Sequence, residues 1–215
     1  MKRVLTTVCA VALVAFAAQA QAAKMYGGVK AGANFADIGG SDAPSNTSMH
    51  TGFQGGLFVG THVNDQFGFR VEGLYVMKGA KYDEEISPGQ TVKVTGKLDY
   101  IEFPLLFVYD IPAGESLGVN LFAGPTLGFN VKAKAEAAGY GTVDVKDQTK
   151  SFEFGAAFGA GLEKKMANGK GIGIDARYSL GATTISKDQN GQSFSVKNRG
   201  IGVMAFFSVP LGSQQ

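Results

Sequence analysis

The residues that most resemble a nucleophilic catalytic group lie close together near the N-terminal end of the chain. They are Asp42, Ser48 and His50. A serine activated by a histidine, which is itself oriented by an acid, attacks acyl carbons in many hydrolases. The spacing is unspecific, because polar loops are generally rich in serine and aspartate. We therefore predict no catalytic residues. With two histidines and a single cysteine, Cys9, we also predict no metal site and no cofactor.

A second group of side chains that could have a chemical role consists of charged residues that alternate with apolar ones along the chain. Counted from the expected turns, the members of this group fall at similar heights on neighbouring strands. A buried charge without a partner costs several kcal/mol, so we predict that they pair with one another. The expected role is structural, and the alternative is a gate whose ion pairs exchange and admit water. The predicted interior network comprises Lys30, Arg70, Glu72, Glu102, Asp175 and Arg177.

The element that would position two of these charges is the stretch Ser151–Leu180. Its even-numbered positions are apolar on both sides of the Asn168-Gly169 turn, whereas its odd-numbered positions hold charges and glycines. A period of two on both sides of a turn predicts a β-hairpin. In this hairpin we expect Asp175 and Arg177 to lie opposite Ala157, Gly159 or Gly161, which would leave room for them.

The same alternation recurs along the chain and predicts eight strands. The connections between them alternate between long and short, so an up-and-down barrel would gather all the long loops at one end. Pro104 cannot donate to a strand ladder, so we expect a bulge or local break there. The strands outside the hairpin are predicted at Met25–Ile38, Thr51–Val63, Phe67–Lys78, Lys97–Tyr109, Leu117–Val131 and Val196–Leu211, and the long loops at Gly39–His50, Gly79–Gly96, Lys132–Lys150 and Gly181–Ser195.

Two kinds of eight-stranded barrel fit this pattern, and they differ in which face meets water. A soluble lipocalin-like carrier has an apolar interior and a charged exterior, whereas a membrane barrel has the reverse arrangement. The polar face here is rich in glycine and carries few charges. Glycine weakens a solvated strand, but it makes room for large side chains in a narrow lumen. We therefore predict an all-β fold, an eight-stranded antiparallel up-and-down transmembrane β-barrel.

The N-terminal segment is predicted to be a signal peptide. Lys2 and Arg3 precede an apolar stretch that ends in small residues around Ala18–Ala22, which are typical of a cleavage site. We therefore assign residues 1–23 to the signal peptide and residues 24–215 to one barrel domain. The chain has 20 basic and 18 acidic residues, and loss of Lys2 and Arg3 leaves 18 of each. This balance excludes the basic surplus expected of a nucleic-acid-binding protein.

Six segments resemble the outer-membrane β-barrel domain family, which includes PorT-like proteins. The architecture is also similar to that of small OmpX- and OmpA-type barrels. The likeness covers nearly the whole chain after the signal peptide, and it implies fold and location rather than a particular activity. The segments that carry it are Gly28–Phe35, Gly52–Gly60, Phe69–Lys81, Leu98–Leu106, Asn120–Phe129 and Asp175–Gly181.

Together these observations predict an integral protein of the bacterial outer membrane that is not an enzyme. Its interior would be packed rather than an open pore, and its role would be structural or would depend on the long loops binding a partner outside the cell. Expected partners are membrane lipid, the barrel-assembly machinery during biogenesis and an extracellular molecule, with no nucleic acid. The alternatives are a narrow pore or secretion-accessory barrel, a lipid-modifying enzyme and a soluble lipocalin-like carrier.

Overall fold

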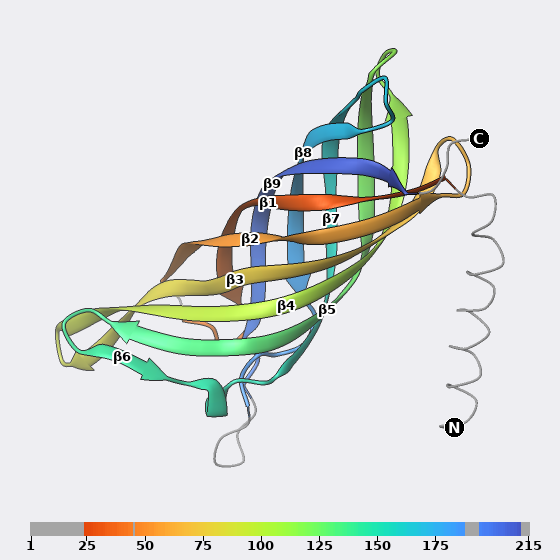
Figure 1. The fold of residues 1–215 in the computed structure, drawn as a ribbon. Helices are drawn as coiled ribbons and strands as arrows, with labels where there is room; N and C mark the ends of the chain where they lie inside the picture. Colours follow the sequence, from red (N-terminus) through yellow and green to blue (C-terminus); the bar gives the residue numbers. More distant parts are fainter. Residues whose placement is uncertain (1–23, 45, 188–193, 212–215) are drawn as a thin grey trace, which may run out of the picture.

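The computed structural model of the protein describes residues 24–44, 46–187 and 194–211, and the predicted signal peptide (residues 1–23) lies outside them. The described residues form antiparallel strands and one short 3-10 helix (Figure 1). No helix among them is long and apolar enough to cross a membrane. The elements are β1 (Lys24–Gly39), β2 (Thr47–His62), β3 (Phe67–Ser87), β4 (Gln90–Pro112), β5 (Leu117–Ala137), β6 (Gly141–Asp144), η1 (Lys146–Gln148), β7 (Phe152–Lys165), β8 (Gly171–Gly181) and β9 (Lys197–Leu211).

Eight of the described strands close into a ring. Their order is β4-β3-β2-β1-β9-β8-β7-β5, and pairing of β4 with β5 completes the circle, while β6 adds to the edge of β5 outside it. Each strand of the ring is antiparallel to its neighbours. The predicted eight-stranded up-and-down barrel is therefore confirmed.

The outer surface of the ring is apolar and its interior is polar. On β7, Phe154 and Phe158 are 42% and 49% exposed, whereas Glu153, which precedes Phe154 and lies on the opposite face, is 3% exposed. On β1, Val29 is 51% exposed and the adjacent Lys30 only 3%. This polarity suits lipid outside the barrel, and it excludes the soluble lipocalin-like carrier, which needs charges outside.

Interior glycines make room for the large side chains of neighbouring strands. Gly159 pairs with Arg177 and Gly161 with Asp175, as the hairpin pattern predicted. A Cβ atom on Gly159 would lie 2.7 Å from the ring of Phe122, and one on Gly173 would lie 2.4 Å from the ring of Phe206. Substitution of these glycines would therefore displace lumen side chains from a narrow, filled interior.

Two of the predicted long loops are wrong. Residues 79–96 continue β3 and begin β4, which pair out to Ser87 and Gln90 around a tight turn. Residues 132–150 extend β5 to Ala137 and add β6 and η1. Their polar composition was interpreted as loop, but strands that leave the membrane no longer need an apolar face. Figure 1 shows this extension of β3, β4, β5 and β6 at the lower left, away from the short turns at the upper right.

The outer face changes from apolar to charged where the extension begins. Rings of Phe67, Phe107 and Tyr109 contact one another near the short turns. A second group, Phe103, Phe129 and Phe152, lies nearer the extension. Outer-membrane barrels carry aromatic residues near the membrane interfaces, and the first group lies where the interface on the short-turn side is expected. Beyond the second group the outward positions include Lys81, Lys97 and Lys132.

Pro104 interrupts strand pairing without shifting it. The ladder between β3 and β4 pairs Val71 with Leu105 and resumes at Leu74 and Glu102 in the same register. The predicted local break is therefore present, but no bulge accompanies it. The register shift in β4 lies between Asp99 and Tyr100, where it faces β5.

The outward face of the ring should tolerate a charge far less well than the extension does. We expect Val203→Arg, in the middle of β9, to lower the free energy of unfolding by about 2–4 kcal/mol in lipid vesicles. The exposed fractions of Val203 and Val143 are 44% and 64%, but Val143 lies on β6. Val143→Arg should therefore change stability by less than about 0.5 kcal/mol. Urea titrations of both variants measure this difference. Equal effects would mean that the ring does not face lipid.

Candidate functional site

Five charged side chains form a cluster in the middle of the barrel. Glu72 on β3 is its centre, because Lys30 Nζ lies 2.9 Å from its Oε1 and Arg177 Nη1 lies 2.8 Å from its Oε2. Arg70 Nε is also 2.9 Å from Glu72 Oε1. Asp175 contacts Lys30 at 2.5 Å and Arg177 at 3.7 Å. We call these five residues the central cluster, and all of them are buried.

A second cluster lies beside the first, toward the extension. Lys78 Nζ contacts Glu102 Oε1 at 2.5 Å and Glu153 Oε1 at 2.8 Å, and Asn198 donates to the other oxygen of Glu153. We call Lys78, Glu102 and Glu153 the upper cluster. It has one cation and two carboxylates, whereas the central cluster has three cations and two carboxylates. The charges are therefore balanced only when both clusters are counted together.

The structure brings together five of the six residues that the sequence grouped. Glu102 is the exception, because it pairs with Lys78 in the upper cluster. The sequence-based set omitted Lys78 and Glu153. A signal for them lies in the strand register, since Glu102 and Glu153 both lie opposite Gly128, on either side of β5. Finding it requires alignment of three strands, which alternation alone does not supply.

Aromatic rings surround the cations of both clusters. The guanidinium carbon of Arg70 lies 4.7 Å from the centre of the Phe122 ring, and that of Arg177 lies 5.3 Å from it. Lys78 Nζ lies 4.8 Å from the centre of the Tyr100 ring. A cation over an aromatic face is stabilised by about 0.5–2 kcal/mol, more where water is excluded. These rings fill the lumen between the ion pairs.

An apolar plug closes the lumen on the side of the extension. Strand residues and the connection between β8 and β9 meet there, and all six core members are buried. The plug residues are Ile38, Ala80, Leu98, Tyr100, Ala133 and Ile185, with Val145 and Val196 packed against them. These apolar side chains pack together between the upper cluster and the extension.

The connections around the plug are bound to one another. The backbone amide of Lys150 donates to the carbonyl of Ile185, and the backbone amide of Lys187 donates to the carbonyl of Gln148. The amide of Ser195 donates to the Asp42 carboxylate, and this bond lowers the pKa of Asp42 below its usual value. The described parts of three predicted loops therefore form one hydrogen-bonded cap rather than separate mobile segments.

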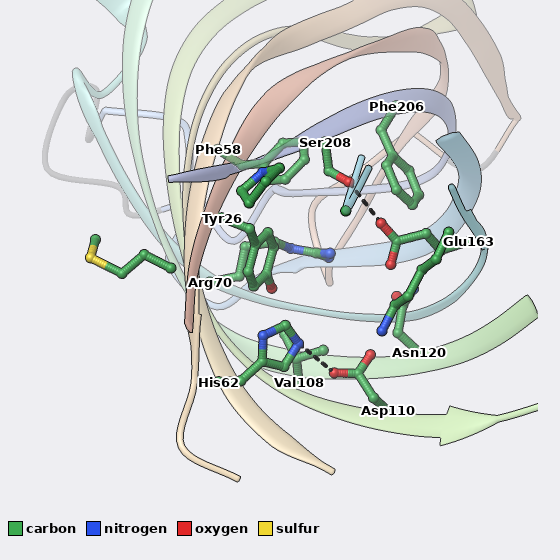
Figure 2. Close-up of a pocket in the computed structure, with 14 residues that line it drawn as sticks. Tyr26, Phe58, His62, Arg70, Val108, Asp110, Asn120, Glu163, Phe206 and Ser208 are labelled. Atoms are coloured by element: carbon green, nitrogen blue, oxygen red, sulfur yellow. Dashed lines mark hydrogen bonds and ion pairs between the residues drawn. The ribbon is translucent and has the colours of Figure 1, made fainter. Parts of the chain in front are cut away.

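A pocket of about 210 Å³ opens at the short-turn end of the barrel (Figure 2). His62 and Asp110 lie 3.1 Å apart on its wall, and the ring of His62 packs 4.9 Å from that of Tyr26. Ser208 donates to Glu163 across another part of the wall. Figure 2 shows Arg70 extending from the barrel wall among these side chains. The pocket therefore ends at the central cluster.

Asp42, Ser48 and His50 do not form a hydrogen-bonded catalytic relay. Asp42 accepts bonds from Ser41 and Ser195, and neither ring nitrogen of His50 has a hydrogen-bond partner. His50 is buried at the level where β2 pairs with Ala36, whereas Ser48 is exposed. Among the described residues, no group of three or more His, Cys, Asp or Glu side chains is arranged to hold a metal ion.

Comparison with known families gives one match. The family model described as "Outer membrane protein beta-barrel domain" matches residues 17–187. No curated protein matches the sequence. The family resemblance carried by the six sequence segments is therefore confirmed.

Solved structures with similar folds are small outer-membrane proteins. Ail, the attachment invasion locus protein of Yersinia pestis, is 17% identical over 86% of this chain and 99% of that one, with a TM-score of 0.43. Neisserial surface protein A is 16% identical over 85% of this chain and 95% of that one, with a TM-score of 0.47. OprG from Pseudomonas aeruginosa is 11% identical over 89% of this chain and 97% of that one, with a TM-score of 0.48. Likeness at this level says nothing about activity.

Removal of the Glu72 carboxylate should be the most damaging single charge change in the lumen. Glu72→Gln leaves Lys30, Arg70 and Arg177 with only Asp175 as a counter-charge. We expect a loss of about 3–5 kcal/mol in the free energy of unfolding, measured by urea titration in vesicles.

The matched control is Glu136→Gln, which removes the carboxylate of an exposed ion pair with Lys97. Exposed pairs contribute little, so its urea midpoint should barely move. Replacing Lys30 with Met in the Glu72→Gln background should restore part of the stability. Equal midpoints for Glu72→Gln and the wild type would show that the central cluster does not hold the barrel together.

Proposed function

Because the chain belongs to the outer membrane protein β-barrel domain family, we propose that its barrel acts as a closed support for a contact surface outside the cell. The protein is an integral barrel of the bacterial outer membrane, in contact with lipid. The contact surface would be the extension built from β3, β4, β5 and β6. The observation that carries this proposal is that these strands continue as an ordered sheet far beyond the length that a membrane requires.

Strand lengths support this proposal. A tilted strand spans a bilayer in about 9–11 residues, whereas β4 has 23 residues and β3 has 21. On β4, the outward positions from Ile101 to Tyr109 are all apolar or aromatic, and they cover about the length that spans a bilayer, so Gln90–Lys97 reaches past the membrane. In outer-membrane barrels the short turns face the periplasm and the long connections face outward. The extension would therefore stand above the cell surface.

Side chains at the tips of the extension support a binding role. Ile86, Tyr140 and Val143 are 48%, 71% and 64% exposed, although they lie where water rather than lipid is expected. A partner that covered these side chains would bury them together, and apolar patches rimmed by polar residues mark interaction sites. The charges around them have both signs, with Lys93 and Lys134 near Asp83 and Glu136. A partner would therefore be recognised by apolar contact more than by net charge.

The filled lumen favours a role as a closed support over a role as a pore. Ion pairs of the central and upper clusters cross the barrel, and the apolar plug lies beyond them. Eight strands leave an interior that side chains fill. The small second cavity near Lys78 and Glu102 has only about 10 Å³, room for a single water molecule at most.

We include three further parts in the proposal. The protein has no enzymatic activity, in keeping with a His50 side chain that is hydrogen-bonded to neither Ser48 nor Asp42. Residues 1–23 are an export signal that precedes the barrel domain of residues 24–215. Barrel-assembly machinery inserts that domain, as lipid accepts only closed sheets.

The contact surface can be tested by photo-crosslinking in intact cells. Benzoylphenylalanine in place of Tyr140 or Ile86 should produce a discrete crosslinked product of higher mass, because both side chains point into the space that a partner would occupy. The same reagent in place of Phe158, which is 49% exposed on the ring, should produce none, since it faces lipid. Heat-dependent gel mobility confirms that each variant is folded. Folded Tyr140 and Ile86 variants without a product would refute the contact role.

The closed lumen predicts no current through the wild-type protein. In a planar bilayer we expect conductance indistinguishable from that of bare lipid, because the ion pairs and the plug block the barrel. A porin inserted in the same bilayer serves as the positive control. Stepwise conductance that changes in Glu102→Ala or Arg177→Ala would instead identify a narrow pore through the charged clusters.

A further inference from the structure

We infer that the pocket at the short-turn end binds a small organic monoanion, a carboxylate with an apolar body, through the guanidinium group of Arg70. The pocket opens on the opposite side of the barrel from the extension. In outer-membrane barrels this end faces the periplasm. Its ligand would therefore come from the periplasm, and the site is independent of the proposed surface contact.

Arg70 is the cation of the central cluster with the fewest hydrogen bonds. Its side chain is 5% exposed, yet its Nη2 atom has no hydrogen-bond partner among the described residues. Its Nε atom lies 2.9 Å from Glu72 Oε1 without hydrogen-bond geometry. By contrast, Arg177 and Lys30 both donate hydrogen bonds to Glu72. A buried guanidinium donor without an acceptor costs free energy that an anion would recover.

The charge balance of the central cluster also favours an anion. Three cations face two carboxylates within this cluster, and the upper cluster and the pocket residues Asp110 and Glu163 lie outside it. A monoanion beside Arg70 would make the central cluster neutral. Arg guanidinium groups bind carboxylates through two parallel hydrogen bonds, and Arg70 lines the pocket with donors that have no partner.

The pocket wall selects among anions. Asp110, Glu163 and Lys165 line it beside Arg70, so a doubly charged anion, such as the dianion of phosphate, would be repelled more strongly by the two carboxylates than a monoanion would. Tyr26, Phe58 and Phe206 supply aromatic surface for the body of a ligand, as Figure 2 shows. A volume of about 210 Å³ accommodates a compact ring or short chain rather than a polymer. These features fit a carboxylate attached to a small apolar group.

The experiment uses the full-length folded protein in nanodiscs of zwitterionic lipid. Benzoate is the probe, benzamide is the uncharged control of the same shape, and NMR chemical shifts of Arg70 and His62 are the readout. We expect saturable shifts with benzoate and weak or no shifts with benzamide or inorganic phosphate. Arg70→Gln should weaken benzoate binding about tenfold or more, since a hydrogen bond to a charged group contributes about 1.5–3 kcal/mol.

A second pair of variants keeps the test decisive if Arg70→Gln does not fold. Ser208→Phe places a ring in the pocket and should abolish the shifts, whereas Ser208→Ala leaves the pocket open and should retain them. No shift with saturating benzoate would overturn the inference, as would equal binding of benzamide or of phosphate. Benzoate binding that survives Ser208→Phe would place the anion elsewhere and would also overturn it.

Discussion

Backbone hydrogen bonding in lipid is the constraint on which this structure depends. Hydrocarbon offers no partner to an exposed amide or carbonyl group, so the spanning strands must close on one another. Pairing of β4 with β5 completes that closure. Because side chains alternate along a strand, closure then assigns one face of every strand to lipid and the other to the lumen. The apolar exterior and the charged interior are two results of one requirement.

Eight strands make the lumen so narrow that its charges must be arranged as a unit. Glu72 contacts three cations, and Lys78 contacts two carboxylates. Neither cluster is neutral by itself, so the field of each is offset by the other. The glycines opposite Arg177 and Asp175 provide the space for this arrangement. A strand's composition is therefore set by its neighbours across the ladder as much as by its own conformational preference.

The fold could be predicted from the sequence where the strands lie in lipid, because there the alternation of apolar and polar residues is strict. For the hairpin of β7 and β8, Asp175 and Arg177 were predicted to lie opposite Ala157, Gly159 or Gly161, and they pair with Gly161 and Gly159. Where β3 and β4 leave the membrane, the outward face becomes polar and the strict alternation is lost, so the pattern no longer differs from that of a loop. The pairing of Lys78 with Glu153 was also missed, because these residues lie 75 positions apart and meet only through the order of strands in the ring.

The two ends of the barrel meet different solvents, and this difference explains why only one carries an open sheet. An unpaired edge such as that of β6 is unacceptable in hydrocarbon, but water satisfies its amide and carbonyl groups. The extension can therefore exist only beyond the membrane. In water, however, Ile86, Tyr140 and Val143 gain nothing from exposure, whereas Phe158 on the ring is stabilised by lipid. Exposure of an apolar side chain is therefore favourable on the ring, where it meets lipid, and unfavourable on the extension, where it meets water. Burial against a partner would remove the apolar tips of the extension from water and would stabilise them.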